Sequence, residues 1–201
     1  MKILITAFDL YGKSPYGSAL TLGKALSERL GYPLEIIPVS YKRADETIRE
    51  LVERYQPELL LMLGQAGADR ELRIEHIAIN MRDVNLPDID GYTACKEVID
   101  DSLPMALFAQ GDIAAMRDAV RAVGLRAKRS NSAGLFVCNS TFFRALALER
   151  EYPQMQTIFV HLPKLPEQQE YFPDHFVMPL EDMILGVETI INYHIAAFSK
   201  V

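Results

Sequence analysis

Short apolar runs and amphipathic helical patterns alternate along this chain, and the alternation restricts the fold that it can adopt. Several of the helical patterns end at a glycine or a proline, as helices commonly do. Alternation of this kind predicts an α/β fold, an α/β/α sandwich in which helices cover both faces of a mostly parallel, twisted sheet. We expect strands at 2–8, 34–40, 58–64, 72–80 and 157–163. We expect helices at 18–30, 42–55, 111–124 and 179–198, and a further helix that begins near Cys138.

Length and composition fit one globular domain spanning residues 1–201. Of these residues 49% are apolar and 24% are charged, a balance that excludes a disordered chain. The net charge of −6 disfavours nucleic acid as a partner. No apolar run approaches the roughly 20 residues that span a bilayer. The N-terminus also lacks a signal-peptide pattern, so we expect a cytoplasmic protein without a membrane segment.

The loop after the first predicted strand ends in Gly12-Lys13-Ser14, like a phosphate-binding loop of the form G-x-x-x-x-G-K-[ST]. Ala7 stands where that motif needs its first glycine, and Asp9 would repel a phosphate. Bulky aromatic residues in the same loop would crowd a nucleotide further. We therefore expect no nucleotide here and no cofactor elsewhere.

Cys138 lies where a turn meets a helical pattern. The small and polar residues 130–134 precede it, and the helix is expected to begin close to it. A thiol at a helix N-terminus feels the positive end of the dipole, which lowers its pKa, and the first-turn N–H groups can stabilise an oxyanion. The alternative is a small buried residue, which is common for a single cysteine. Cys95 lies in the polar segment 82–104 and not at the start of a predicted helix, so nothing in its surroundings is expected to activate its thiol.

Among the four histidines, His161 alone follows an apolar strand segment at its carboxyl end. His76 follows Glu75 in a strand, so their side chains point to opposite faces, and His175 and His194 are expected in solvent. An imidazole can take and return the proton of a thiol, and Glu75 would gain a buried partner by orienting His161. Each could instead be structural. The histidines and cysteines show no metal-ligand spacing, so we expect no metal.

Several motifs resemble those of the pyroglutamyl peptidase I (pyrrolidone-carboxylate peptidase) family of cysteine peptidases, almost from end to end. The most specific are SNSAGLFVCN, which is similar to the nucleophile motif, and FVHLPKLPEQ, which is similar to the histidine motif. TAFDLYG resembles T-G-F-[DE]-P-F-G, and LPDIDG resembles I-P-D-N-x-G. GQAGADRELRIEHIAIN resembles G-Q-A-G-x-R with the following strand that carries the glutamate. The resemblance implies a phosphorylase/hydrolase-like fold.

The resemblance also implies an activity, the removal of N-terminal pyroglutamate from peptides. Cys138 would be the nucleophile, His161 the general base and acid, and Glu75 the residue that orients His161. Aromatic and amide side chains suit the flat faces and the polar edge of a lactam ring; the residues implied here are Phe8, Tyr11, Gln65, Phe136 and Val137. A homo-oligomer, dimer or tetramer, is implied as well.

The chain departs from the family motifs near the expected site. Ala7, Leu10 and Tyr11 replace the Gly, Pro and second Phe of the first motif, and Gly17-Ser18 stands where an Asn-Pro pair is usual. Asn85 replaces an Arg before the I-P-D motif, and Asp69 takes the place of the loop Arg, with Arg70 after it. Two alternatives stay open: a thiol amidohydrolase for another small cyclic or blocked amide, and a catalytically weak homologue that binds pyroglutamate.

Overall fold

The computed structural model describes residues 1–67 and 69–198. Six strands of this part form one sheet in the order β2-β1-β3-β8-β4-β7. Their bounds are β1 Ile3–Phe8, β2 Leu34–Ile37, β3 Leu59–Gln65, β4 Leu72–Glu75, β7 Ala127–Ser130 and β8 Gln156–Leu162. A separate two-stranded sheet pairs β5 (Ile77–Ile79) with β6 (Ala106–Phe108).

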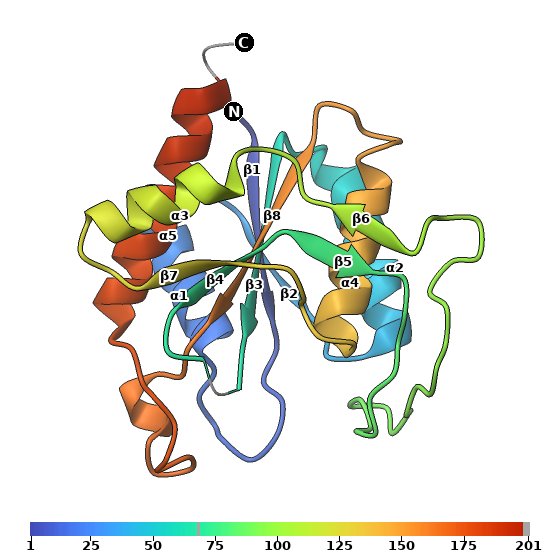
Figure 1. The fold of residues 1–201 in the computed structure, drawn as a ribbon, viewed down its shortest axis with the longest axis horizontal. Helices are drawn as coiled ribbons and strands as arrows, with labels where there is room; N and C mark the ends of the chain where they lie inside the picture. Colours follow the sequence, from blue (N-terminus) through green and yellow to red (C-terminus); the bar gives the residue numbers. More distant parts are fainter. Residues whose placement is uncertain (68, 199–201) are drawn as a thin grey trace.

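Helices cover both faces of the main sheet, which confirms the predicted α/β/α arrangement (Figure 1). One layer contains α1 (Ser18–Leu30), α3 (Ile113–Ala122) and α5 (Leu180–Phe198). The other contains α2 (Tyr41–Tyr55) and α4 (Val137–Leu148), and a short 3₁₀ turn, η1 (Pro166–Gln168), follows β8. None of the described helices is both long and apolar enough to cross a membrane.

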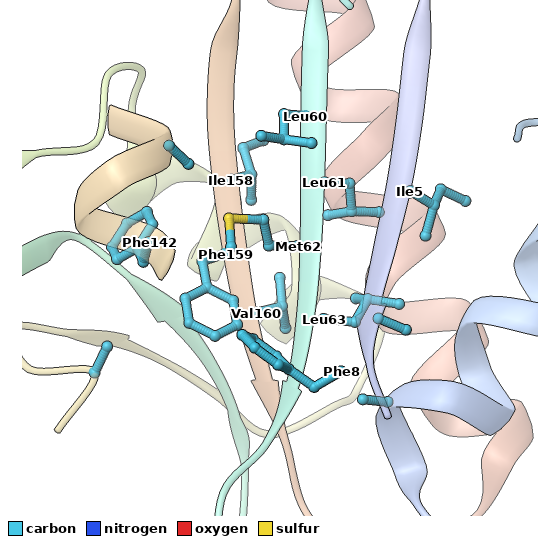
Figure 2. Close-up of a cluster of buried hydrophobic side chains, with 14 of the residues drawn as sticks. Ile5, Phe8, Leu60, Leu61, Met62, Leu63, Phe142, Ile158, Phe159 and Val160 are labelled. Atoms are coloured by element: carbon cyan, nitrogen blue, oxygen red, sulfur yellow. The ribbon is translucent and has the colours of Figure 1, made fainter. Parts of the chain in front are cut away.

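The core lies on both faces of the central strands, where the sequence has its longest apolar runs. Leu59 to Leu63 of β3 are fully buried, because parallel strands covered by two helix layers expose neither face. Phe142 of α4 packs edge-on against Phe159 of β8 with their ring centroids 5.3 Å apart (Figure 2). This contact holds the N-terminal half of α4 over the middle of β8.

The direction of β4 decides which side chains meet at the sheet. Strands β2, β1, β3 and β8 run parallel, whereas β4 is antiparallel to β8 and β7 is parallel to β4. The register places Arg73 opposite His161 and Glu75 opposite Phe159. Because side chains alternate along a strand, these four residues share one face, the face that α4 covers.

The predicted helices and most predicted strands agree with the structure to within a few residues, and the main correction concerns 72–80. This segment is not one strand: it divides at His76 into β4, in the main sheet, and β5, which pairs with β6. The short strands β6 and β7 were not predicted. The sequence of β7, Ala127 to Ser130, is half charged and lies at the sheet edge, so it lacks an apolar run.

Asn139 joins the helix that carries Cys138 to the small sheet. Its Oδ1 accepts from the backbone N of Ile79 at 2.9 Å, and its Nδ2 donates to the carbonyl oxygens of Ile79 at 2.7 Å and Met81 at 3.1 Å. The side chain is fully buried. It makes hydrogen bonds to Ile79 of the kind that a second neighbouring strand would make, in addition to the pairing of β5 with β6. It therefore fixes the start of α4 against the backbone that follows Glu75.

Asn139→Ala should lower the free energy of unfolding by about 2–3 kcal/mol, because it leaves buried backbone groups of β5 unpaired. Urea unfolding followed by circular dichroism measures this. Asn85→Ala, at an exposed position, serves as the control and should change the value by less than about 0.5 kcal/mol. Equal stability of the two variants would mean that Asn139 does not hold α4 in place.

Candidate active site

His161 and Glu75 form a buried pair at the end of β8. Nδ1 of His161 lies 2.8 Å from Oε1 of Glu75, and the two side chains are 6% and 0% exposed. A carboxylate can only accept, so Nδ1 of His161 is the donor in this contact. In a neutral imidazole the lone pair then lies on Nε2, which is the nitrogen left for proton transfer.

Neighbouring strands limit how the imidazole can move. Gly64 of β3 is paired with His161, and a Cβ built on Gly64 would lie only 2.9 Å from Cδ2 of the imidazole. The ring of Phe159 also lies against the imidazole, with a centroid separation of 4.5 Å. The backbone of Gly64 therefore gives His161 the space that it needs, and Phe159 fixes its tilt.

Cys138 is the second residue of α4, so its thiol lies at a helix N-terminus as the sequence predicts. The turn before it reaches the left-handed region at Gly134, with φ +80°, which a glycine adopts without strain. Burial of the thiol, together with the negative charge of Glu75, raises the pKa of Cys138 to about 12. A backbone hydrogen bond and the charge of Arg73 act in the opposite direction and are smaller.

The pKa of Cys138 corrects the expectation from the helix dipole. Before substrate binds, the thiol is protonated at neutral pH, because desolvation and Glu75 outweigh the first-turn N–H groups. No hydrogen bond joins Sγ to His161 within residues 1–67 and 69–198, and a gap of this kind often closes only when substrate binds.

A cavity of about 150 Å³ opens beside the thiol. Its walls come from the loop after β1, the end of β3, the start of α1 and the start of α4. Four of the five predicted substrate-binding residues line it together with Cys138, namely Phe8, Tyr11, Gln65 and Phe136. Val137 does not: it is fully buried in the hydrophobic core. Residues that sequence reasoning missed also line the cavity: Asp9, Leu10, Tyr16, Gly17, Ala19 and Val39.

The polar groups of the cavity are oriented by neighbours. Oε1 of Gln65 accepts from the backbone N of Ser18 at 2.9 Å and from its Oγ at 3.0 Å, so Nε2 is the group that Gln65 can offer to a ligand. Tyr11 donates from its hydroxyl to the carbonyl oxygen of Pro87 at 2.5 Å. Its ring lies 5.5 Å from that of Phe136. The extra hydroxyl of Tyr11 thus ties the loop after β1 to the segment that contains Pro87.

The remaining histidines lie away from the Glu75–His161 pair. His76 contacts Arg129, with Nδ1 2.8 Å from Nη2. His175 is half-buried and its Nδ1 lies 2.5 Å from the carbonyl oxygen of Gly67. The expectation that His194 lies in solvent is wrong, since it is only 3% exposed and packs in the α5 layer. Within the described residues, no group of three or more His, Cys, Asp or Glu side chains is placed to hold a metal.

Comparison with known proteins identifies the family to which this chain belongs. The family model of pyroglutamyl peptidase matches residues 1–197. The pyrrolidone-carboxylate peptidase of Streptococcus suis is 36% identical over 196 residues, covering 96% of this chain and 91% of the relative. That of Fusobacterium nucleatum is 34% identical over 195 residues, covering 95% and 91%.

Solved structures agree with these sequence matches. The pyrrolidone carboxyl peptidase of Thermococcus litoralis has a TM-score of 0.91 at 28% identity, covering 100% of this chain and 96% of that one. The pyroglutamyl peptidase I of Bacillus amyloliquefaciens has a TM-score of 0.88 at 25% identity, covering 94% and 91%. The fold and these relatives make the chain a peptidase, a class of hydrolase. Within that class, it belongs to the pyroglutamyl peptidase family.

Gly64→Ala should lower both stability and peptidase activity. The added Cβ would lie 2.9 Å from His161 and from two ring atoms of Phe159, so one ring must move. We expect a loss of about 1–3 kcal/mol in unfolding free energy, and about a hundredfold in kcat if the imidazole shifts by about 1 Å. Gly67→Ala, whose Cβ meets nothing within 4 Å, is the stability control. Unchanged kcat in a folded Gly64→Ala protein would contradict this role.

Proposed function

We propose that this peptidase removes N-terminal pyroglutamate from peptides, with Cys138 as nucleophile, His161 as general base and acid, and Glu75 orienting His161. The observation that carries the proposal is the cavity in which the thiol of Cys138 and the amide of Gln65 meet aromatic walls. The family to which the chain belongs supports the same substrate class.

The size and lining of the cavity suit a pyroglutamyl group. A cavity of about 150 Å³ is known to hold one small ring such as benzene, so a five-membered lactam fits and a long side chain does not. Phe8, Tyr11 and Phe136 offer aromatic surface to the faces of the ring. Nε2 of Gln65 can donate to the lactam carbonyl, because Ser18 already occupies its Oε1.

The acylation step uses the lone pair on Nε2 of His161. This nitrogen takes the thiol proton, Sγ of Cys138 adds to the pyroglutamyl carbonyl carbon, and first-turn N–H groups of α4 stabilise the oxyanion. The imidazolium, held by Glu75, returns the proton to the peptide amine as the C–N bond breaks. An acyl-enzyme with a thioester bond remains.

Deacylation repeats the proton transfers with water. His161 takes a proton from water, and the hydroxyl adds to the thioester carbon. The C–S bond then breaks, pyroglutamate leaves, and the sulfur regains its proton from the imidazolium. His161 thus acts as base and then as acid in each half of the proposed reaction.

Cys138→Ser should lower kcat for a chromogenic pyroglutamyl amide by at least about a thousandfold, as loss of a nucleophile does in other triads. Cys95→Ser is the matched control, since Cys95 is exposed and outside the cavity, and it should retain full turnover. Mass spectrometry of acid-quenched enzyme should show an acyl adduct on Cys138. Wild-type turnover by Cys138→Ser would remove the proposed nucleophile.

Gln65→Glu should lower kcat/KM for the pyroglutamyl amide by at least about a hundredfold, because a carboxylate keeps the contacts with Ser18 but offers no N–H to the lactam. Gln154→Glu, at an exposed position, adds the same charge without touching the cavity. Prolyl and glutamyl amides, assayed in parallel, test the ring itself. Equal turnover of the prolyl amide would contradict lactam recognition by Gln65. Binding of pyroglutamate without any cleavage would favour a binding homologue.

A further inference from the structure

Arg73 is the cation that lies beside the buried carboxylate of the site. Its Nη2 is 3.0 Å from Oε1 of Glu75, the same oxygen that contacts His161. The side chain of Glu75 has no exposed surface, whereas that of Arg73 is 19% exposed. A carboxylate without water is strongly destabilised unless a cation and hydrogen bonds compensate it. The guanidinium of Arg73 provides the cation for Oε1, while Oε2 of Glu75 has no hydrogen-bond partner among the described residues.

Other groups hold the guanidinium in one orientation. Nη1 of Arg73 donates to Oδ2 of Asp69 at 2.7 Å, and Nη2 donates to Oγ of Ser130 at 3.0 Å and to the carbonyl oxygen of Ser132. Asp69 is fixed in turn by Lys128, whose Nζ lies 2.9 Å from Oδ1. The guanidinium is therefore anchored by several groups besides Glu75. This arrangement is more than a surface ion pair.

The same guanidinium acts on the nucleophile. The negative charge of Glu75 raises the pKa of Cys138, and the charge of Arg73 lowers it. Arg73 thus influences both ends of the proposed proton-transfer path, although it does not line the cavity. Its position follows from the register of β4 with β8, which sets Arg73 directly opposite His161.

We propose that Arg73 is a positioning residue for the Glu75–His161 pair, whose guanidinium holds the carboxylate of Glu75 in the orientation in which Oε1 contacts Nδ1 of His161. The proposal rests on the proposed roles of Cys138, His161 and Glu75. It assigns Arg73 no contact with the substrate.

The pH dependence that follows has a definite sign. The charged or titratable groups that face Glu75 are Arg73 from β4, His161 from β8 and Cys138 from α4, with Asp69 and Lys128 behind Arg73. Without the guanidinium, Glu75 loses the cation that favours the charged form of its carboxyl group over the protonated form. A protonated Glu75 no longer stabilises an imidazolium. The acidic limb of kcat/KM against pH therefore moves to higher pH when Arg73 is neutralised.

The experiment compares Arg73→Met, Arg73→Lys and Arg129→Gln in the pyroglutamyl amide assay across pH. Arg73→Met should lower kcat by about 10- to 100-fold, with little change in KM, and shift the acidic limb upward. Arg73→Lys keeps a charge and should keep the limb in place. Arg129, on the neighbouring strand and in contact with His76, is the matched control and should behave as wild type.

The double variant Glu75→Gln/Arg73→Met separates positioning from simple structural support. Since the amide that Glu75→Gln introduces carries no charge for the guanidinium to compensate, adding Arg73→Met to this variant should lower kcat much less than Arg73→Met does in the wild-type background. Additive losses of kcat, or an unchanged profile in folded Arg73→Met, would overturn the proposal. If Arg73→Met does not fold, as judged by circular dichroism, a shifted limb in folded Arg73→Lys would overturn it as well.

Alkylation of Cys138 gives a readout that does not depend on the substrate. In a Cys95→Ser background Cys138 is the only thiol, so iodoacetamide labelling below its pKa follows the thiolate fraction. Arg73→Met should slow labelling at pH 8 severalfold, because it removes a charge that lowers the pKa of Cys138. Unchanged labelling would contradict an influence of Arg73 on Cys138. Labelling that slows while Cys138→Ser remains active would instead count against the proposed nucleophile alone.

Discussion

The contact between a fully buried carboxylate and an imidazole, Glu75 with His161, is the interaction on which the rest of the site depends. It fixes which nitrogen of His161 carries a proton, and it places a negative charge close to Cys138. A charge of this kind survives burial only with a compensating cation. Arg73 is the cation beside Glu75. Asp69 contacts Arg73 in turn, and Lys128 contacts Asp69, so charges of alternating sign extend from Glu75 to the edge of the sheet.

The reversed direction of β4 makes this arrangement possible. In an entirely parallel sheet the carboxyl ends of all strands lie at one edge, and the residues that follow them enter the loops there. Antiparallel pairing instead sets Glu75 opposite Phe159 and brings Arg73 opposite His161. The chain then turns at His76 into β5, where Asn139 holds it against α4. One short strand thus links the histidine, its carboxylate and the helix that carries the thiol.

The sequence was sufficient to predict the layers, because apolar periodicity is a local feature, and its motifs imply the triad that we propose. It was not sufficient for the register of β4, which depends on strands far apart in the chain. Arg73 had a usable signal, since it lies two positions before Glu75 and must share its face. Asp69, which takes the place of the loop Arg of the family motif, accepts a hydrogen bond from Arg73, and this contact explains why an acidic residue suits the position. Tyr11, which replaces the family's second Phe, uses its additional hydroxyl to donate to the carbonyl oxygen of Pro87, a contact between loops that no local motif predicts.

The high pKa of Cys138 means that the thiol is neutral in the resting protein, although it lies at a helix N-terminus. A helix N-terminus alone would favour a thiolate, but burial and Glu75 keep the resting sulfur neutral. A neutral thiol reacts slowly with oxidants and alkylating agents, so the proposed nucleophile is protected in the resting protein. In the mechanism that we propose, substrate brings a carbonyl whose developing charge the first-turn N–H groups stabilise. Proton transfer to His161 would then be favourable only together with bond formation, and the charges of Glu75 and Arg73 would set the balance between protection and reactivity.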